Sequence, residues 1–204
     1  MHRQEYFTGA TIIAVFIALI GCTGNKNTAE DQPARFTKAD SVAETYLELQ
    51  DSMLNSWNRM INDDNHKIKA MKNLLHELTI AGKYDPEQVN SLEQRLEQLS
   101  RIRYTPRTMS NSDVVEEYDF ASNSIVSELI SMTESHPAFA YNETMQALVE
   151  KIRSADQRVT IYRDEYDRVA HRFNNFLERN KEYLGEIEVD TAQKKPLFQM
   201  VSGE

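Results

Sequence analysis

Apolar residues recur at alternating spacings of three and four over most of this chain, which is the pattern that one face of an α-helix produces. The clearest run predicts a long helix from Asn142 to Leu184, which would extend ~64 Å at the rise of an α-helix. Its apolar positions are Met145, Leu148, Ile152, Ala155, Val159, Tyr162, Tyr166, Val169, Phe173 and Phe176. A run of this length without a gap favours packing against other helices in a bundle or coiled coil.

Three more helices are predicted upstream. The first runs from about Lys38 to Ala81, and Asp64 interrupts its apolar stripe. The second begins at Pro86, where proline suits the first helical position, and ends before residues 104–106. The third spans roughly residues 113–134. Because short links favour antiparallel neighbours, we predict an all-α fold: an elongated antiparallel up-and-down bundle over residues 38–184, with two long helices and two shorter ones.

The first 21 residues have a different pattern, typical of a bacterial lipoprotein leader. A short apolar stretch ends at Leu19-Ile20-Gly21-Cys22, which is similar to a lipobox, and Arg3 supplies a modest positive start. In such leaders the peptide is cut before the cysteine, which is then acylated. The apolar run is about half the ~20 residues that a spanning helix needs. We therefore predict that residues 1–21 are a signal peptide and that the mature chain begins at a lipidated Cys22.

Two alternatives to the lipoprotein remain open. The leader could stay uncleaved as a short anchor, or be cut so that the chain is released. If Cys22 carries lipid, several acyl chains would hold the chain stably at a membrane, where a single chain binds only marginally. Residues 22–37 would form a flexible tether, and residues 185–204, which show no period, a C-terminal tail. If the source has two membranes, the absence of an acidic residue after Cys22 favours the outer membrane, facing the periplasm.

Composition narrows the class of partner. The 204-residue chain has a net charge of -9, which disfavours nucleic acid because nucleic-acid binding needs a basic surface. Cys22 is the only cysteine, so no disulfide can form within the chain. The chain has 6 glycines, a scarcity that favours helices over a turn-rich β fold.

No recognised catalytic or metal-binding pattern is present. The histidines at positions 66, 76, 136 and 171 do not form a zinc-binding pair, and no phosphate loop or nucleophile elbow occurs. Glu44, Glu48 and Asp51 share one helix face without a histidine, which favours a solvated acidic face over a metal site. We therefore expect no enzyme activity, no metal and no cofactor.

Three further residues have a packing interpretation and a binding interpretation. Trp57 lies on the apolar stripe of the first helix, so core packing is favoured over an exposed partner contact. Arg158 and Arg163 are expected to pair with acidic residues across the bundle, and binding of a ligand is the alternative.

Several short motifs resemble the LemA family of bacterial envelope proteins, in order and in spacing. The strongest stretch is Asp156-Gln157-Arg158-Val159, followed by Arg163, Tyr166-Asp167 and Phe173-Asn174. Weaker matches are Asn55-Ser56-Trp57, Asn73-Leu74-Leu75, His136-Pro137 with Asn142, and Lys195-Pro196-Leu197-Phe198. The resemblance covers roughly residues 41–198. The chain departs from the family at Lys72, where proline is usual, and in having a lipobox in place of an N-terminal membrane helix.

The resemblance implies a mostly helical extracytoplasmic domain with no established enzymatic activity. The leading hypothesis is a lipid-anchored interaction or scaffold module of the cell envelope, with an envelope protein or a second copy as its partner. The first rival is a ligand-binding receptor or enzyme with a site inside the bundle near Asp64, because a buried charge needs partners. The second rival is a structural spacer between envelope layers.

Overall fold

The fold of the described residues is built from helices alone. The computed structural model describes residues 36–189 and 191–198, and no strand occurs among them. The helices are α1 (Lys38–Ala81), α2 (Pro86–Ile102), α3 (Ser112–Ser135), α4 (Glu143–Arg179) and α5 (Lys181–Glu186), with a short 3-10 turn η1 (Phe139–Tyr141) before α4. The prediction of an all-α fold is confirmed. In this part of the chain, no helix combines the length and the apolar character that crossing a bilayer requires.

Helix ends coincide with the capping residues of the sequence. Thr37 caps α1 in a reciprocal arrangement: its hydroxyl accepts from the Asp40 amide at 3.1 Å, and the Asp40 carboxylate accepts from the Thr37 amide at 2.7 Å. The Thr37 amide, and after it the Thr37 hydroxyl, which also donates to this carboxylate at 2.7 Å, lower the pKa of Asp40. At the other end, Gly82 adopts a φ of 73°, a left-handed conformation that glycine enters without steric cost. The chain then turns into α2 at Asp85 and Pro86.

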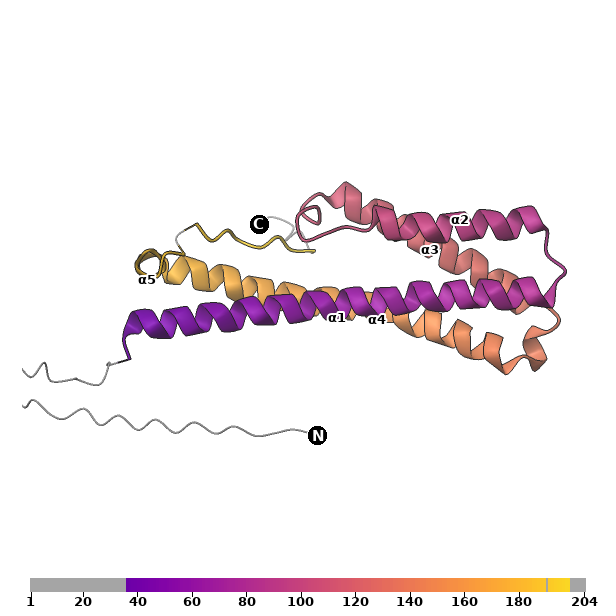
Figure 1. Cartoon of the computed structure of the whole chain (residues 1–204), viewed down its shortest axis with the longest axis horizontal. Helices are drawn as coiled ribbons and strands as arrows, with labels where there is room; N and C mark the ends of the chain where they lie inside the picture. The colour runs from indigo at the N-terminus through magenta and orange to yellow at the C-terminus, as the bar shows by residue number, and fades with distance from the viewer. Residues whose placement is uncertain (1–35, 190, 199–204) are drawn as a thin grey trace, which may run out of the picture. The chain divides into compact units, whose positions relative to one another are not determined.

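The four longer helices run alternately up and down, and they do not all have the same extent (Figure 1). α1 and α4 are antiparallel and pack against each other along most of their lengths, whereas the α2–α3 hairpin lies along the half of α1 that is nearer its C-terminal end. The core is therefore a four-helix core in one half and a two-helix seam in the other. Its largest fully buried side chains are Phe173, Met71, Leu74, Leu78, Leu92, Leu96, Leu99, Ile125, Leu129, Met145 and Ile152.

The fourth helix is shorter than the apolar pattern predicts. A continuous helix was expected from Asn142 to Leu184, but α4 ends at Arg179 and α5 begins at Lys181. The residue between them, Asn180, donates its side-chain amide to the Phe176 carbonyl at 2.9 Å. A short polar side chain that bonds the backbone in this way competes with the regular helical pattern, so the chain bends just beyond Phe176, the last position of the predicted apolar run.

The chain after α5 returns along the bundle. Residues 191–198, here called the C-terminal segment, have no regular structure, and side chains of α4 hold them. Asn174 makes two hydrogen bonds to the backbone of Lys195, at 2.9 and 2.7 Å. The Asp167 carboxylate accepts from the amide of Phe198 at 2.9 Å. Hydrogen bonds to side chains thus order a segment in which the sequence shows no apolar period.

Candidate functional site

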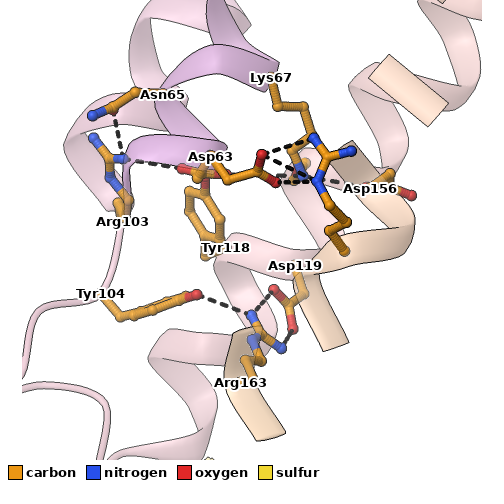
Figure 2. Close-up of polar contacts among 12 residues, drawn as sticks. Asp63, Asn65, Lys67, Arg103, Tyr104, Tyr118, Asp119, Asp156 and Arg163 are labelled. Atoms are coloured by element: carbon orange, nitrogen blue, oxygen red, sulfur yellow. Dashed lines mark hydrogen bonds and ion pairs between the residues drawn. The ribbon is translucent and has the colours of Figure 1, made fainter. Parts of the chain in front are cut away.

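Charged and polar side chains interrupt the apolar core near the middle of α1 and α4 (Figure 2). They come from α1, α3, α4 and the link between α2 and α3, so the fold gathers them from distant parts of the sequence. This central polar cluster consists of Asp63, Asp64, Lys67, Arg103, Tyr104, Tyr118, Asp119, Ser122, Asp156, Arg158 and Arg163.

Asp64 has the partners that a nearly buried carboxylate requires. Its side chain is 11% exposed. It accepts from the Tyr118 hydroxyl at 2.5 Å and from the Arg103 guanidinium at 3.0 Å, and the Lys67 ammonium lies 3.8 Å away. Burial and then the neighbouring Asp64 raise the pKa of Tyr118 well above its usual value, so this hydroxyl stays protonated and donates. The expectation that Asp64 needs partners is confirmed, and the protein itself supplies them.

Lys67 is the most deeply buried of the four cations in the cluster. Its side chain is only 3% exposed. The ammonium donates to Ser122 Oγ at 3.0 Å and to Asp156 Oδ1 at 3.2 Å, which joins α1 to α3 and α4. Losing water from an ammonium is costly unless hydrogen bonds and an opposite charge replace it. The cluster provides both.

The two arginines of α4 form the ion pairs expected of them. Arg158 contacts both oxygens of Asp63, with its shortest bond at 2.7 Å. This hydrogen bonding raises the pKa of Arg158. Arg163 binds Asp119 through two parallel bonds of 2.6 and 2.7 Å and donates to the Tyr104 hydroxyl at 3.2 Å. Burial alone would lower the pKa of Arg163, but the bonds to Asp119 and Tyr104 outweigh it and raise that pKa. Both guanidinium groups remain charged.

A cavity of about 270 Å³ lies within the central polar cluster. It is bounded by α1, α3 and α4. Lys67, Tyr118 and Ser122 line its buried side, while Asn123 and Thr160 are exposed at its rim. The remaining lining residues are Met60, Asp63, Asp64, Tyr104, Asp119, Ala155, Asp156, Val159, Tyr162 and Arg163.

An aromatic cluster connects the C-terminal segment to the central polar cluster. The Phe198 ring stacks on Trp57 with 6.4 Å between ring centroids, and it meets Tyr104 and Tyr166 edge-on at 5.3 and 5.5 Å. The Arg163 guanidinium lies 5.0 Å from the centre of the Phe198 ring, within cation–π range. Trp57 is half-buried and packed against the core, so the packing interpretation is confirmed.

The other residues singled out by sequence do not join this site. Cys22 lies outside the described residues. His66, His76 and His171 are exposed, whereas His136 is buried and accepts the Ala138 amide at 3.1 Å. Glu44, Glu48 and Asp51 are exposed on α1. Over residues 36–189 and 191–198, no group of three or more histidine, cysteine, aspartate or glutamate residues could hold a metal ion.

Sequence reasoning missed several members of the cluster. Lys67 follows Tyr46, Met53 and Met60 at steps of seven residues, and those three are buried on the face of α1 toward the core. That spacing could have predicted a buried lysine. Asp119 and Arg103 carry no such signal, because neither lies on an apolar stripe and their partners are 44 and 39 residues away.

The structure is thus that of an all-helical bundle with a polar centre. The sequence model of the LemA family matches residues 79–204, more than half of the chain, and the chain belongs to this family. The match starts near the end of α1, so the resemblance suggested for residues 41–78 stays a prediction. No curated protein matches the chain, and no solved structure does.

The residues of α4 whose order and spacing resemble the LemA family lie at two places in this geometry. Asp156, Arg158 and Arg163 belong to the central polar cluster. Asp167 and Asn174 hold the C-terminal segment. The spacing of these motifs along one helix therefore corresponds to two neighbouring tasks, which are building the polar centre and fixing the end of the chain.

Proposed function

We propose that this protein is a lipoprotein of the cell envelope, anchored through lipid on Cys22, whose extracytoplasmic bundle is an interaction module without catalytic activity. The lipobox-like sequence Leu19-Ile20-Gly21-Cys22 supports the anchor. Membership of the LemA family supports an envelope setting. The observation that carries the interaction role is a pair of exposed leucines on α1, here called the apolar strip.

The apolar strip consists of Leu47 and Leu54, which are 59% and 58% exposed. They are seven residues apart and so share one side of α1, in the half that the α2–α3 hairpin does not cover. Beside Leu54 lies an apolar groove of about 240 Å³, lined by Gln50, Met53, Trp57, Pro106, Tyr166 and Lys195. An amphipathic helix can lay its apolar face along such a strip.

Charge identifies the kind of helix that fits. At 100° per residue, Glu44, Glu48 and Asp51 lie next to the apolar strip around the helix, and all three are exposed. A partner segment with basic residues flanking its apolar face would pair with them, whereas an acidic segment would be repelled. The proposed partner is therefore a basic amphipathic helix of an envelope protein.

Cross-linking in intact cells tests the interaction. A photo-reactive residue at position 47 is expected to capture one recurrent segment that is helical in pattern and basic. Leu54→Glu should abolish that cross-link, because it places a charge in the contact. Ile80→Glu is the matched control, since Ile80 is 68% exposed on the same helix but lies at its other end. Capture of an acidic segment, or equal capture by both variants, would refute the proposed surface. A cross-link from position 47 only to a second copy of this chain would favour the alternative of a structural spacer.

The anchor is tested separately. The mass of the mature wild-type chain should show that residues 1–21 are absent and that Cys22 is acylated. Cys22→Ser should abolish both changes, because the cut is made before this cysteine, so its mass should include residues 1–21 and no acyl chain. A wild-type chain in the membrane fraction that keeps residues 1–21 and carries no acyl chain would mean that the leader itself is the anchor. This result would leave the apolar strip untouched, so the two parts of the proposal can fail independently.

A further inference from the structure

We propose that the cavity in the central polar cluster binds a neutral, hydroxyl-rich ligand about the size of one sugar ring. This inference does not depend on the anchor at Cys22 or on the apolar strip. The volume of about 270 Å³ is at the small end of ligand pockets, which excludes an extended molecule but admits a monosaccharide or a cyclic polyol. The exposed rim at Asn123 and Thr160 provides the opening.

The charges of the cluster select a neutral ligand. The cluster contains four aspartates, and each is paired with a cation. The pairs are Asp63 with Arg158, Asp64 with Arg103, Asp119 with Arg163 and Asp156 with Lys67. Figure 2 shows these contacts converging from α1, α3, α4 and the link after α2. A charged ligand would either break one of these pairs or remain unpaired itself, and both are costly in a partly buried site. A neutral ligand avoids this cost.

The hydrogen-bonding capacity of the lining suits hydroxyl groups. A carboxylate can accept about four hydrogen bonds, and the contacts of Asp156 to its described neighbours use one of its two oxygens. The Nε–H of Arg163 is buried and finds no acceptor among the described residues. Hydroxyl groups suit both, because each can donate to a carboxylate or accept from an N–H, and a ligand with several hydroxyl groups can supply one to each.

Aromatic rings complete the match to a saccharide. Tyr104, Tyr118 and Tyr162 line the cavity together with its polar groups. A sugar ring presents C–H groups on its faces and hydroxyl groups at its edge, so it can pack on tyrosine while bonding to carboxylates. A purely apolar ligand would displace water from those carboxylates without replacing the lost hydrogen bonds.

The test is calorimetric titration of the full chain in detergent with glucose, galactose, N-acetylglucosamine and inositol. For a ligand of this size we expect one site with a dissociation constant on the order of 1 mM. The double variant Asn123→Leu/Thr160→Leu, which narrows the rim without touching a charged residue, should weaken binding at least tenfold. Asn90→Leu/Thr144→Leu makes the same exchanges at exposed positions away from the cavity and should bind as the wild type does.

Each outcome decides the proposal. Binding of at least one of the four compounds, lost in the rim variant and kept in the control, supports it. Tighter binding of glucuronate or glucosamine than of glucose would overturn the neutral class. No binding by any compound, or equal binding in the rim variant, would overturn the site. A disaccharide separates the two sources of the ligand: binding equal to or tighter than that of its monomer indicates the end of a glycan chain, and weaker binding indicates a free sugar.

Discussion

Replacing Asp64 by leucine tests whether the central polar cluster stabilises the fold as a network. The change removes the acceptor of the Tyr118 hydroxyl and the partner of Arg103 at once. A buried hydroxyl without a partner costs about 1–3 kcal/mol. Arg103 is less affected, because it keeps its bond of 2.8 Å to Asn65 and is partly exposed. Lys67 keeps Asp156 and Ser122 but loses a nearby negative charge.

The size of the stability loss in Asp64→Leu follows from these lost contacts. Removing one partner of a fully buried pair costs about 3–5 kcal/mol. Asp64 retains some exposure and its cations retain other partners, so a loss of about 3 kcal/mol in the free energy of unfolding is expected for Asp64→Leu. In a domain of this size that corresponds to a fall of roughly 6–12 °C in Tm. Urea and thermal unfolding followed by circular dichroism measure both quantities.

Two companion variants identify the source of the loss. In Asp63→Leu the released partner is Arg158, which is 40% exposed and can be hydrated, so a loss of only about 1 kcal/mol is expected. A double-mutant cycle of Asp64→Leu with Tyr118→Phe should give a coupling energy of about 1.5–3 kcal/mol, since it isolates the bond to a charged acceptor. An Asp64→Leu protein as stable as the wild type, or more stable, would refute the reasoning.

Three further predictions concern other parts of the bundle. Burial raises the pKa of each of Tyr104, Tyr118 and Tyr166, that of Tyr166 to about 12. The unfolded chain therefore releases protons near pH 10 that the folded chain retains. Each of these tyrosines then lowers the free energy of unfolding by about 1.4 kcal/mol per pH unit above that point. A urea midpoint that stays constant from about pH 9 to about pH 11 would contradict this prediction. Phe198→Ala should free the C-terminal segment at a cost of about 1–2 kcal/mol, because the lost ring is half-buried, and should expose the chain near Lys195 to trypsin; unchanged cleavage would show that the hydrogen bonds of Asn174 and Asp167 hold the segment without the ring. Lys67→Met should alter stability by less than about 1 kcal/mol, because Asp156 is 36% exposed and can be hydrated; a loss as large as that of Asp64→Leu would assign the central role to the lysine.

The helices were predictable because local signals agree with the apolar period. The predicted bounds of the first helix, Lys38 and Ala81, are those of α1, where Thr37 and Gly82 mark the ends. The apolar run of the fourth helix ends at Phe176, and the predicted extension to Leu184 passes over Asn180, whose side-chain bond to the backbone accompanies the end of α4. Periodicity alone did not place that break, because it records which face is buried and not how each backbone group is bonded.

The site was only partly predictable, for a related reason. Asp64 was identified because a charge on an apolar stripe is visible in one helix. Its main partners, Tyr118 and Arg103, come from other elements, 54 and 39 residues away along the chain. The C-terminal segment is a similar case, since Asn174 and Asp167 bind its backbone and leave no mark on its own sequence. Contacts of this kind depend on the tertiary arrangement. The spacing of residues within one sequence does not show which distant residues come together in the fold.

Because the α2–α3 hairpin packs along only one half of α1, the two halves of the bundle should resist a pulling force differently. Among the described residues, tension that enters the domain at Lys38 acts on the half of α1 that α4, α5 and the C-terminal segment hold, with Tyr104 and Pro106 of the link after α2 at its inner end. The half beyond the central polar cluster has the hairpin as well, and it contains Leu92, Leu96, Leu99 and Leu129, all almost completely buried. Under load α1 would therefore separate from α4 in the first half while the second half keeps its structure. The ion pairs of the central polar cluster lie between the two halves, so the separation is expected to stop there.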